Sequence, residues 1–421
     1  MCSENLLPDC SNESWKSWFQ RKELAPEFER AGSDPAGLLR IVSTCFEQYG
    51  KWICDVPAVQ GGATYDFSVE YGVENVGHES VSLHGMLTWK NREGVVITRD
   101  YTDRVKDLGN GWKSLSRKLD SPEKAESLLV ELAFKWSDNG SVTWRNPLLR
   151  KVDPVPHRIV KAASAFIDKN GTLDFSLRQM LAVIDKAGAE KADILCMGET
   201  VYDWGVDLPM DQRAVTIPGP LTEILSERAS RHNMNIVLSL NESEGGLFYN
   251  TGLLIDRKGE IAGKYRKMQL PLCEGEDGIT PGRGYPVFDT DFGRIGILIC
   301  WDHGFPEVAR ILTRKGAEIL FLPTLWHTEI QAPARAVDNG VYVVVSAPRW
   351  SKVPCRIISP EGEVIASAMG GEYNENGVCT ATIDLDKRFY TYWTSVGAAF
   401  GEAKSCFMQE RRCDAFGPLS D

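Results

Sequence analysis

Hydrophobic and polar residues follow two different patterns along this 421-residue chain. In residues 1–150, apolar positions often alternate with polar ones in short runs separated by Gly, Asn and Asp, as in half-buried strands. Tyr65, Phe67, Val69 and Tyr71, for example, would share one face. The pattern predicts strands at residues 38–46, 50–56, 64–75, 80–90, 94–102, 111–119, 127–136 and 142–149. A regular series of short strands indicates an all-β sandwich of jelly-roll-like type.

The pattern changes after the connector at residues 151–156, where Pro154 and Pro156 favour an extended backbone. Beyond it, apolar runs alternate with segments of helical spacing. We expect strands at residues 157–167, 192–197, 235–240, 247–256, 295–299, 317–323 and 341–347, and helices at 174–191, 220–232 and 307–316. This alternation predicts an α/β domain in which helices cover a sheet layer.

The most informative strand ends at a cysteine. Residues 294–300 are apolar after Arg294 and finish at Cys300, and Gly304 and Pro306 then separate the strand from the next helix. Strand ends of this kind open into a crevice, and a helix N-terminus favours the thiolate form of a nearby cysteine. The same position also suits a buried structural thiol, so Cys300 alone does not decide the chemistry.

Two further segments carry matching chemistry. The predicted strand 192–197 leads into the carboxylate of Glu199, and a basic cluster at residues 264–267 ends at Lys267. A cysteine nucleophile, a glutamate base and a lysine cation for an oxyanion fill the roles that acyl transfer through a thioester needs. Because glutamate fills the base role, His303 is a weaker candidate for it.

Together these segments resemble the Glu–Lys–Cys motif set of the nitrilase (carbon–nitrogen hydrolase) superfamily. The resemblance rests on Glu199, on Tyr265-Arg-Lys267 and on Cys300-Trp-Asp-His-Gly-Phe-Pro-Glu307, with further similarity at residues 280–296 and 335–339. It implies a four-layered α-β-β-α sandwich with two sheets, which periodicity alone does not distinguish from one doubly wound sheet. The predicted division is an accessory β domain at 1–153, a catalytic domain at 157–400 and a tail at 401–421.

The resemblance also implies residue roles. Cys300 would form the thioester, Glu199 would act as the base, and Lys267 with the backbone N–H of Trp301 would stabilise the oxyanion. Loss of Lys267 is therefore expected to lower the rate far more than the stability of the fold. We expect Trp301, Tyr202 and His327 to bind substrate, with Trp204 as a further pocket residue.

The family commonly has a second glutamate shortly after the lysine. Glu274 and Glu276 both lie there, and the spacing to Pro281 and Gly282 favours Glu276. The resemblance also makes Asp302 informative, since an aspartate at this position is more typical of amidases and carbamoylases than of nitrilases. It favours an amide or N-carbamoyl substrate.

Composition and charge limit the classes of partner that we expect for this protein. The formal net charge of −11 argues against a nucleic-acid or anionic-membrane partner. Residues 1–9 lack the features of a signal peptide, and no apolar stretch is long enough to span a membrane. The eleven cysteines show no zinc-site spacing, so we expect a reduced cytoplasmic protein without metal or organic cofactor.

The N-terminal region adds a less specific resemblance. Its segments at residues 50–52, 65–69 and 87–89 are similar to galactose-binding-like and carbohydrate-binding jelly rolls. Seven of the twelve tryptophans fall here, at positions 15, 18, 52, 89, 112, 136 and 144. They suit either core packing or contact with a glycan or a protein.

Several functions stay open. The leading prediction is hydrolysis of a small-molecule amide or N-carbamoyl compound by a homodimer or larger homo-oligomer, as the family resemblance implies. Nitrile hydrolysis and acyl transfer to an amine or thiol would use the same residues. A non-catalytic binding protein is the remaining alternative.

Overall fold

The computed structural model describes residues 4–31, 36–167, 171–326, 329–348, 355–368, 377–397 and 399–416. The chain divides into two compact units. Unit 1 comprises Met1–Pro156 and Arg388–Asp421, and unit 2 comprises His157–Lys387. Each unit has its own hydrophobic core.

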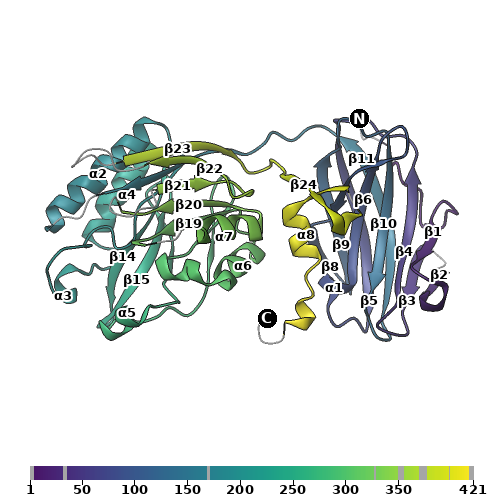
Figure 1. The fold of residues 1–421 in the computed structure, drawn as a ribbon, viewed down its shortest axis with the longest axis horizontal. Helices are drawn as coiled ribbons and strands as arrows, with labels where there is room; N and C mark the ends of the chain where they lie inside the picture. Colours follow the sequence, from purple (N-terminus) through teal and green to yellow (C-terminus); the bar gives the residue numbers. More distant parts are fainter. Residues whose placement is uncertain are drawn as a thin grey trace. The chain divides into compact units, whose positions relative to one another are not determined.

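Unit 1 is built from two sheets that face each other (Figure 1). In the described residues, one sheet, called sheet A here, has the strand order β1-β4-β10-β6-β7-β25-β24, and the other, sheet B, has the order β2-β3-β11-β5-β9-β8. The strands of unit 1 are β1 (Lys16–Phe19), β2 (Glu27–Ala31), β3 (Leu38–Val42), β4 (Tyr49–Val56), β5 (Thr64–Glu74), β6 (Leu83–Lys90), β7 (Val96–Tyr101), β8 (Arg104–Gly109), β9 (Trp112–Asp120), β10 (Ser127–Lys135), β11 (Ser141–Val152), β24 (Tyr390–Trp393) and β25 (Ala399–Glu402). All eight strands predicted for this region are present.

Alternation along these strands explains the core of unit 1. The inward positions of β5, which include Tyr65, Phe67 and Val69, pack in one cluster with inward residues of β4 and β10 such as Trp52 and Leu132. Side chains of successive strand residues point to opposite faces, so each sheet buries every second residue between the layers. The all-β sandwich expected from the sequence is therefore present.

The C-terminal segment belongs to unit 1, which corrects the predicted boundary at residue 400. Strands β24 and β25 extend sheet A, and helix α8 (Ala403–Gln409) packs near β7. The side chain of Arg117 is 2 % exposed and pairs with Glu402. Val396 and Cys406 also share a small core cluster with Met86. These buried contacts explain why the described residues 401–416 are not a separate tail.

Unit 2 contains two further sheets. In the described residues their strand orders are β16-β15-β14-β13-β12-β23, called sheet C, and β17-β18-β19-β20-β21-β22, called sheet D. The strands are β12 (Ile159–Phe166), β13 (Ile194–Cys196), β14 (Asn235–Glu244), β15 (Leu247–Ile255), β16 (Ile261–Arg266), β17 (Val287–Asp289), β18 (Arg294–Ile297), β19 (Ile319–Pro323), β20 (Tyr342–Ser346), β21 (Cys355–Ile358), β22 (Val364–Ala368) and β23 (Gly377–Asp384). In each sheet three parallel strands lie between antiparallel ones.

Helices cover the outer faces of sheets C and D, and the two sheets contact each other, so unit 2 is the four-layered α-β-β-α sandwich that the resemblance implied (Figure 1). Between the sheets, Ser164 donates a hydrogen bond to the carbonyl of Val345, and Ser346 donates one to that of Ala165, each at 2.6 Å. Helices α2 (Leu173–Ala189) and α4 (Pro220–His232) pack on sheet C, and α6 (Pro306–Arg314) and α7 (Gln331–Asn339) on sheet D.

The remaining helices are short. They are α1 (Glu79–Ser82), α3 (Met210–Arg213), α5 (Leu272–Glu276) and the 3-10 turns Lys22–Leu24, Cys300–Gly304, Thr394–Val396 and Cys413–Ala415. No helix among the described residues is long and apolar enough to cross a membrane.

Candidate active site

The ends of three strands in unit 2 bring the candidate chemical groups together. Glu199 follows β13 of sheet C, Lys267 follows β16 at the edge of that sheet, and Cys300 follows β18 of sheet D. The amide of Leu325, just beyond β19, donates a hydrogen bond of 2.9 Å to Oε2 of Glu199. Glu199 therefore receives a donor from the opposite sheet, as expected where strand ends from both sheets converge.

Lys267 is held between two carboxylates. Its side chain is fully buried, and Nζ lies 2.8 Å from Oε1 of Glu199 and 2.6 Å from Oε1 of Glu274. Burial alone would lower the pKa of Lys267, but the charges of Glu199, Cys300 and Glu274 raise it above the ordinary value. The neighbouring negative charges therefore favour the charged ammonium form of Lys267.

Asn250 completes the surroundings of Glu199. Its Nδ2 donates a hydrogen bond of 2.9 Å to Oε1 of Glu199, and its Oδ1 accepts one of 2.5 Å from Ser239. The backbone carbonyl of Asn250 also accepts the amide of Lys267 at 2.9 Å. One residue of β15 thus positions both the carboxylate and the segment that carries the lysine.

The expectation for the second glutamate is corrected. Glu274 contacts Lys267, whereas Glu276, at the end of the short helix α5, is exposed to solvent. Two residues correspond to more than half a turn of helix, so the two side chains leave α5 in different directions. Burial raises the pKa of Glu274 above its ordinary value, and the neighbouring Lys267 opposes this shift.

Cys300 lies in a strained turn between β18 and the helix that follows. Its φ of +40° is in the left-handed region, which is rare for residues other than glycine. Thr200, directly after Glu199, has a φ of +41°, and its branched Cβ makes that conformation less favourable still. Strain of this kind is concentrated at functional sites, and here it occurs at the two turns that carry the thiol and the carboxylate.

The thiol of Cys300 is partly exposed and donates a long hydrogen bond of 3.6 Å to the carbonyl of Trp326. Burial, together with the negative charge of Glu199, raises the pKa of Cys300 to about 12, and the charge of Lys267 opposes that rise. The resting group is therefore a neutral thiol, which needs a base in order to react.

Asp302 connects the cysteine turn to the lysine segment. Its carboxylate accepts hydrogen bonds from the Tyr265 hydroxyl at 2.7 Å, the Ile299 amide at 2.8 Å and the Gln269 amide at 3.0 Å. The residue is fully buried, and burial raises its pKa to about 6. Asp302 therefore acts as a positioning residue between the two segments.

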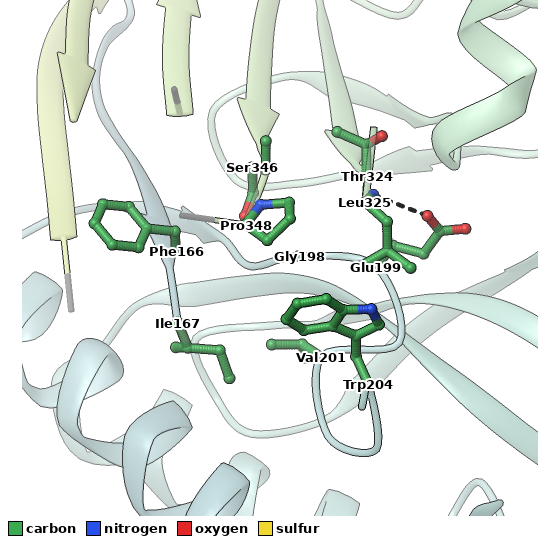
Figure 2. A pocket seen from close by; sticks show the side chains of 11 residues that line it. Phe166, Ile167, Gly198, Glu199, Val201, Trp204, Thr324, Leu325, Ser346 and Pro348 are labelled. Atoms are coloured by element: carbon green, nitrogen blue, oxygen red, sulfur yellow. Dashed lines mark hydrogen bonds between the residues drawn. The ribbon is translucent and has the colours of Figure 1, made fainter. Parts of the chain in front are cut away.

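A cavity lies beside Glu199, at the carboxyl ends of β12, β13, β19 and β20. It encloses about 270 Å³ including its open mouth, and Figure 2 shows the side chains that line it. The described lining is mainly apolar, with Thr324, Ser346 and Glu199 as the polar side chains; it comprises Phe166, Ile167, Gly198, Glu199, Val201, Trp204, Thr324, Leu325, Ser346, Ala347 and Pro348.

The other predicted site residues have different positions. Trp301 is 39 % exposed and packs near Trp326, with ring centroids 6.3 Å apart. Tyr202 packs partly buried against the core of sheet C and does not line the cavity, whereas Trp204 does. His303 is buried beneath the turn, where Nδ1 contacts the carbonyl of Cys300. His327 lies outside the described residues.

Sequence reasoning missed Asn250 and the amide of Leu325. Asn250 lies inside a predicted strand, where a polar side chain among apolar neighbours was a usable signal. A backbone amide leaves no signal in the sequence at all. Within the described residues, no group of three or more His, Cys, Asp or Glu side chains could hold a metal ion.

The sequence of unit 2 matches a known protein family. The profile of the family described as Carbon-nitrogen hydrolase matches residues 159–388, more than half of the chain. The chain belongs to the carbon-nitrogen hydrolase family. As a member of this family it is a hydrolase that acts on C–N bonds.

Two curated relatives of this carbon-nitrogen hydrolase align with it over most of their own length. It is similar to a probable nitrilase of Schizosaccharomyces pombe, with 31 % identity over 42 % of this chain and 71 % of the relative. It is also similar to an omega-amidase of Xenopus laevis, with 30 % identity over 50 % of this chain and 83 % of the relative. Among solved structures, an amidase from Nesterenkonia sp. shares the fold, with a TM-score of 0.50 and 20 % identity over 62 % of this chain and 95 % of that one.

Proposed function

We propose that unit 2 hydrolyses the C–N bond of a small linear amide or N-carbamoyl compound through a thioester on Cys300. The observation that carries this proposal is the fully buried Lys267 paired with Glu199 beside the partly exposed thiol. A buried ion pair contributes little to stability by itself, so its position beside a strained cysteine turn favours a chemical role.

In the first half of the reaction, Glu199 takes the proton of the Cys300 thiol as sulfur attacks the carbonyl carbon. The new C–S bond converts the carbonyl into an oxyanion, which the ammonium of Lys267 stabilises. The first turn of a helix leaves N–H groups without intrahelical acceptors, so the amide of Trp301 is available as a second donor. The C–N bond then breaks, and the amine leaves with the proton from Glu199.

In the second half, Glu199 takes a proton from a water molecule, and the oxygen of that water attacks the thioester carbon. The C–S bond breaks, the carboxylic acid or carbamate product leaves, and the proton returns to the sulfur. The same carboxylate thus acts first as a base and then as an acid in each half of the reaction. Asn250 and Leu325 keep one donor on each oxygen of Glu199, which holds the carboxylate in position during these steps.

The cavity beside Glu199 would accept the acyl part of the substrate. Because its described lining is mainly apolar, a short or branched aliphatic acyl group fits the described part better than a highly polar one. The name of the Xenopus laevis relative supports amides as the substrate class, and the Schizosaccharomyces pombe relative keeps nitriles as the second candidate.

The test is a mass-spectrometric screen of aliphatic amides, N-carbamoyl amines and nitriles. We expect amine or ammonia release from at least one amide or N-carbamoyl compound by the wild type, and loss of that release in Cys300→Ala. Turnover of nitriles alone would contradict the amide assignment, and unchanged turnover by the variant would contradict the thioester. Product analysis with added amines distinguishes hydrolysis from acyl transfer.

We propose that unit 1 is an accessory domain of jelly-roll type. Sheet A contains the order β4-β10-β6-β7 and sheet B the order β3-β11-β5-β9, and these two orders support the proposal because two interleaved Greek keys would produce them. A homo-oligomeric state and a cytoplasmic location stay predictions from the sequence.

A further inference from the structure

The seven tryptophans of residues 1–156 fall into two groups. Four are in the core between the sheets: Trp15, Trp52, Trp89 and Trp144. The other three lie outside it, and each has a cation over its ring. Two of these three, Trp18 and Trp136, flank one region of the outer face of sheet A.

The residues of this region are set by the register of sheet A. Core residues of β10 such as Leu132 and Phe134 point inward, so Glu131 and Lys135 point to the outer face. On that face Trp18 is directly opposite Lys51, and Tyr49 is directly opposite Lys135. We call Trp18, Tyr49, Lys51, His84, Lys135 and Trp136 the sheet A cluster.

Lysine side chains in this cluster lie against aromatic rings. Nζ of Lys51 is 4.6 Å from the ring centroid of Trp18, and Nζ of Lys135 is 4.0 Å from that of Trp136. Trp136 has a φ of +52°, a strained conformation for an aromatic residue. The backbone at the end of β10 is therefore strained at the residue whose ring faces the ammonium.

The two lysines differ in their partners. Lys51 forms an ion pair of 2.7 Å with Glu131. Lys135 is only 7 % exposed, yet no described residue accepts a hydrogen bond from it or forms an ion pair with it. The ammonium keeps slight contact with solvent but has no acceptor among the described residues, and burial of the side chain disfavours its charged form.

Nearby groups do not supply the missing acceptor for the Lys135 ammonium. Lys51 and Arg412 add further positive charge, and His84 is buried beside them without an acidic partner in the described structure. Glu410 is the nearest opposing charge, but its carboxylate accepts the hydroxyl of Tyr101 at 3.0 Å. Burial, with Lys51 and Arg412, lowers the pKa of Lys135 to about 8.

We propose that the sheet A cluster binds a small carboxylate-bearing sugar, a uronic acid in chemical class, with its carboxylate on Lys135 and its ring face against an aromatic side chain. The carboxylate would supply the acceptor that the chain itself does not provide. Trp18 is 38 % exposed, so its ring can stack on the weakly polar C–H face of a sugar. This site lies wholly within unit 1 and does not depend on the reaction proposed for unit 2.

The first test measures thermal unfolding of the full chain by tryptophan fluorescence at constant ionic strength. Sodium glucuronate should raise the Tm of the wild type, and glucose, which has the same ring without a carboxylate, should not. Lys135→Met should abolish the response. Lys106→Met, which removes an exposed lysine of sheet B, should keep it.

The same variants test the unpartnered ammonium without any ligand. Lys135→Met should raise the Tm of the ligand-free protein by about 2 °C or more, since it removes a buried charge without an acceptor and keeps the packing on Trp136. Lys106→Met should leave that Tm unchanged. A lower Tm for Lys135→Met would show that this lysine stabilises the fold, which would contradict the inference.

Three results would overturn the ligand assignment. An equal response to glucose would show that the carboxylate is not recognised. A response to inorganic phosphate as large as that to glucuronate would show an anion site without sugar selectivity. The absence of a response to glucuronate at concentrations up to tens of millimolar would remove the proposed site.

Discussion

The two units each contain a nearly buried lysine, and the surroundings of the two differ. Lys267 in unit 2 contacts two carboxylates, and their charges raise its pKa. Lys135 in unit 1 has aromatic rings beside it and no acceptor among the described residues, and burial lowers its pKa to about 8. Burial alone therefore does not say whether a charge supports the fold. The groups that contact a buried charge decide whether it stabilises the fold.

The largest expected effect comes from removing the partnered lysine. Lys267→Met should lower kcat by about 10³-fold, because it removes an oxyanion donor. It should also lower the free energy of unfolding by about 3–5 kcal/mol, since it leaves Glu199 and Glu274 buried without a cation. This revises the expectation that the loss would affect rate far more than fold. Steady-state kinetics and urea unfolding measure the two effects, and a stability equal to that of the wild type would contradict the comparison.

Unit 1 also contains a buried cation with a carboxylate partner, Arg117, which can be compared with Lys267. Arg117→Met should lower the free energy of unfolding by about 3 kcal/mol, because Glu402 would stay buried without its cation. The double variant Arg117→Met/Glu402→Gln should recover part of that loss. Burial would raise the pKa of Glu402, but Arg117 lowers it to about 2, so the pair persists through mildly acidic pH. A double variant no more stable than the single one would argue against the ion pair.

Asp302 gives a pH-dependent test of the link between the cysteine turn and the lysine segment. Its folded pKa of about 6 lies above the ordinary aspartate value of 3.8, so the folded state holds this proton more tightly than the unfolded chain. Wild-type stability should therefore fall relative to that of Asp302→Asn as pH rises from about 4 to about 6, by about 2 kcal/mol. Urea unfolding across this range measures the difference. A difference that does not change with pH would contradict the buried, protonatable carboxylate.

The smallest expected effect is a change in kcat, and it comes from comparing two glutamates of the short helix α5. Glu274→Gln should lower kcat about 10-fold, because the amide keeps the shape but removes a charge that helps to hold Lys267. Glu276→Gln is the matched control, and its kcat should stay within about 2-fold of the wild type because Glu276 is exposed. If the two variants exchanged these results, the placement of α5 would be wrong.

Much of the fold was predictable from the sequence because its strands follow simple periodicities. Alternation along residues 64–75 predicted β5, and the apolar run before Cys300 predicted β18. The missed strands are β1, β2, β8, β24 and β25 in unit 1 and β16, β17, β21, β22 and β23 in unit 2. Of these, β8 is exposed at every position and therefore has no alternation to detect. The boundary at residue 400 was wrong because β25 pairs with β7 and β24 pairs with β25, and local pattern does not carry the long-range contact with β7.

The candidate site was predictable to the level of its strand-end motifs. The structure places Glu199 and Lys267 in contact with each other, at turns that follow strands as the motifs indicated. The choice between Glu274 and Glu276 depended on the direction of side chains around a single helical turn, which spacing to Pro281 could not give. The role of Lys135 depends on which partners are missing around it, and absence of this kind is visible only in three dimensions.

The most direct measurement of the central claim is mass spectrometry of protein quenched in acid during turnover of an accepted amide. We predict a mass increase equal to the acyl group on the peptide that contains Cys300, and no increase in Cys300→Ala. An acyl group on a different residue, or full turnover by the Cys300→Ala variant, would contradict the thioester mechanism.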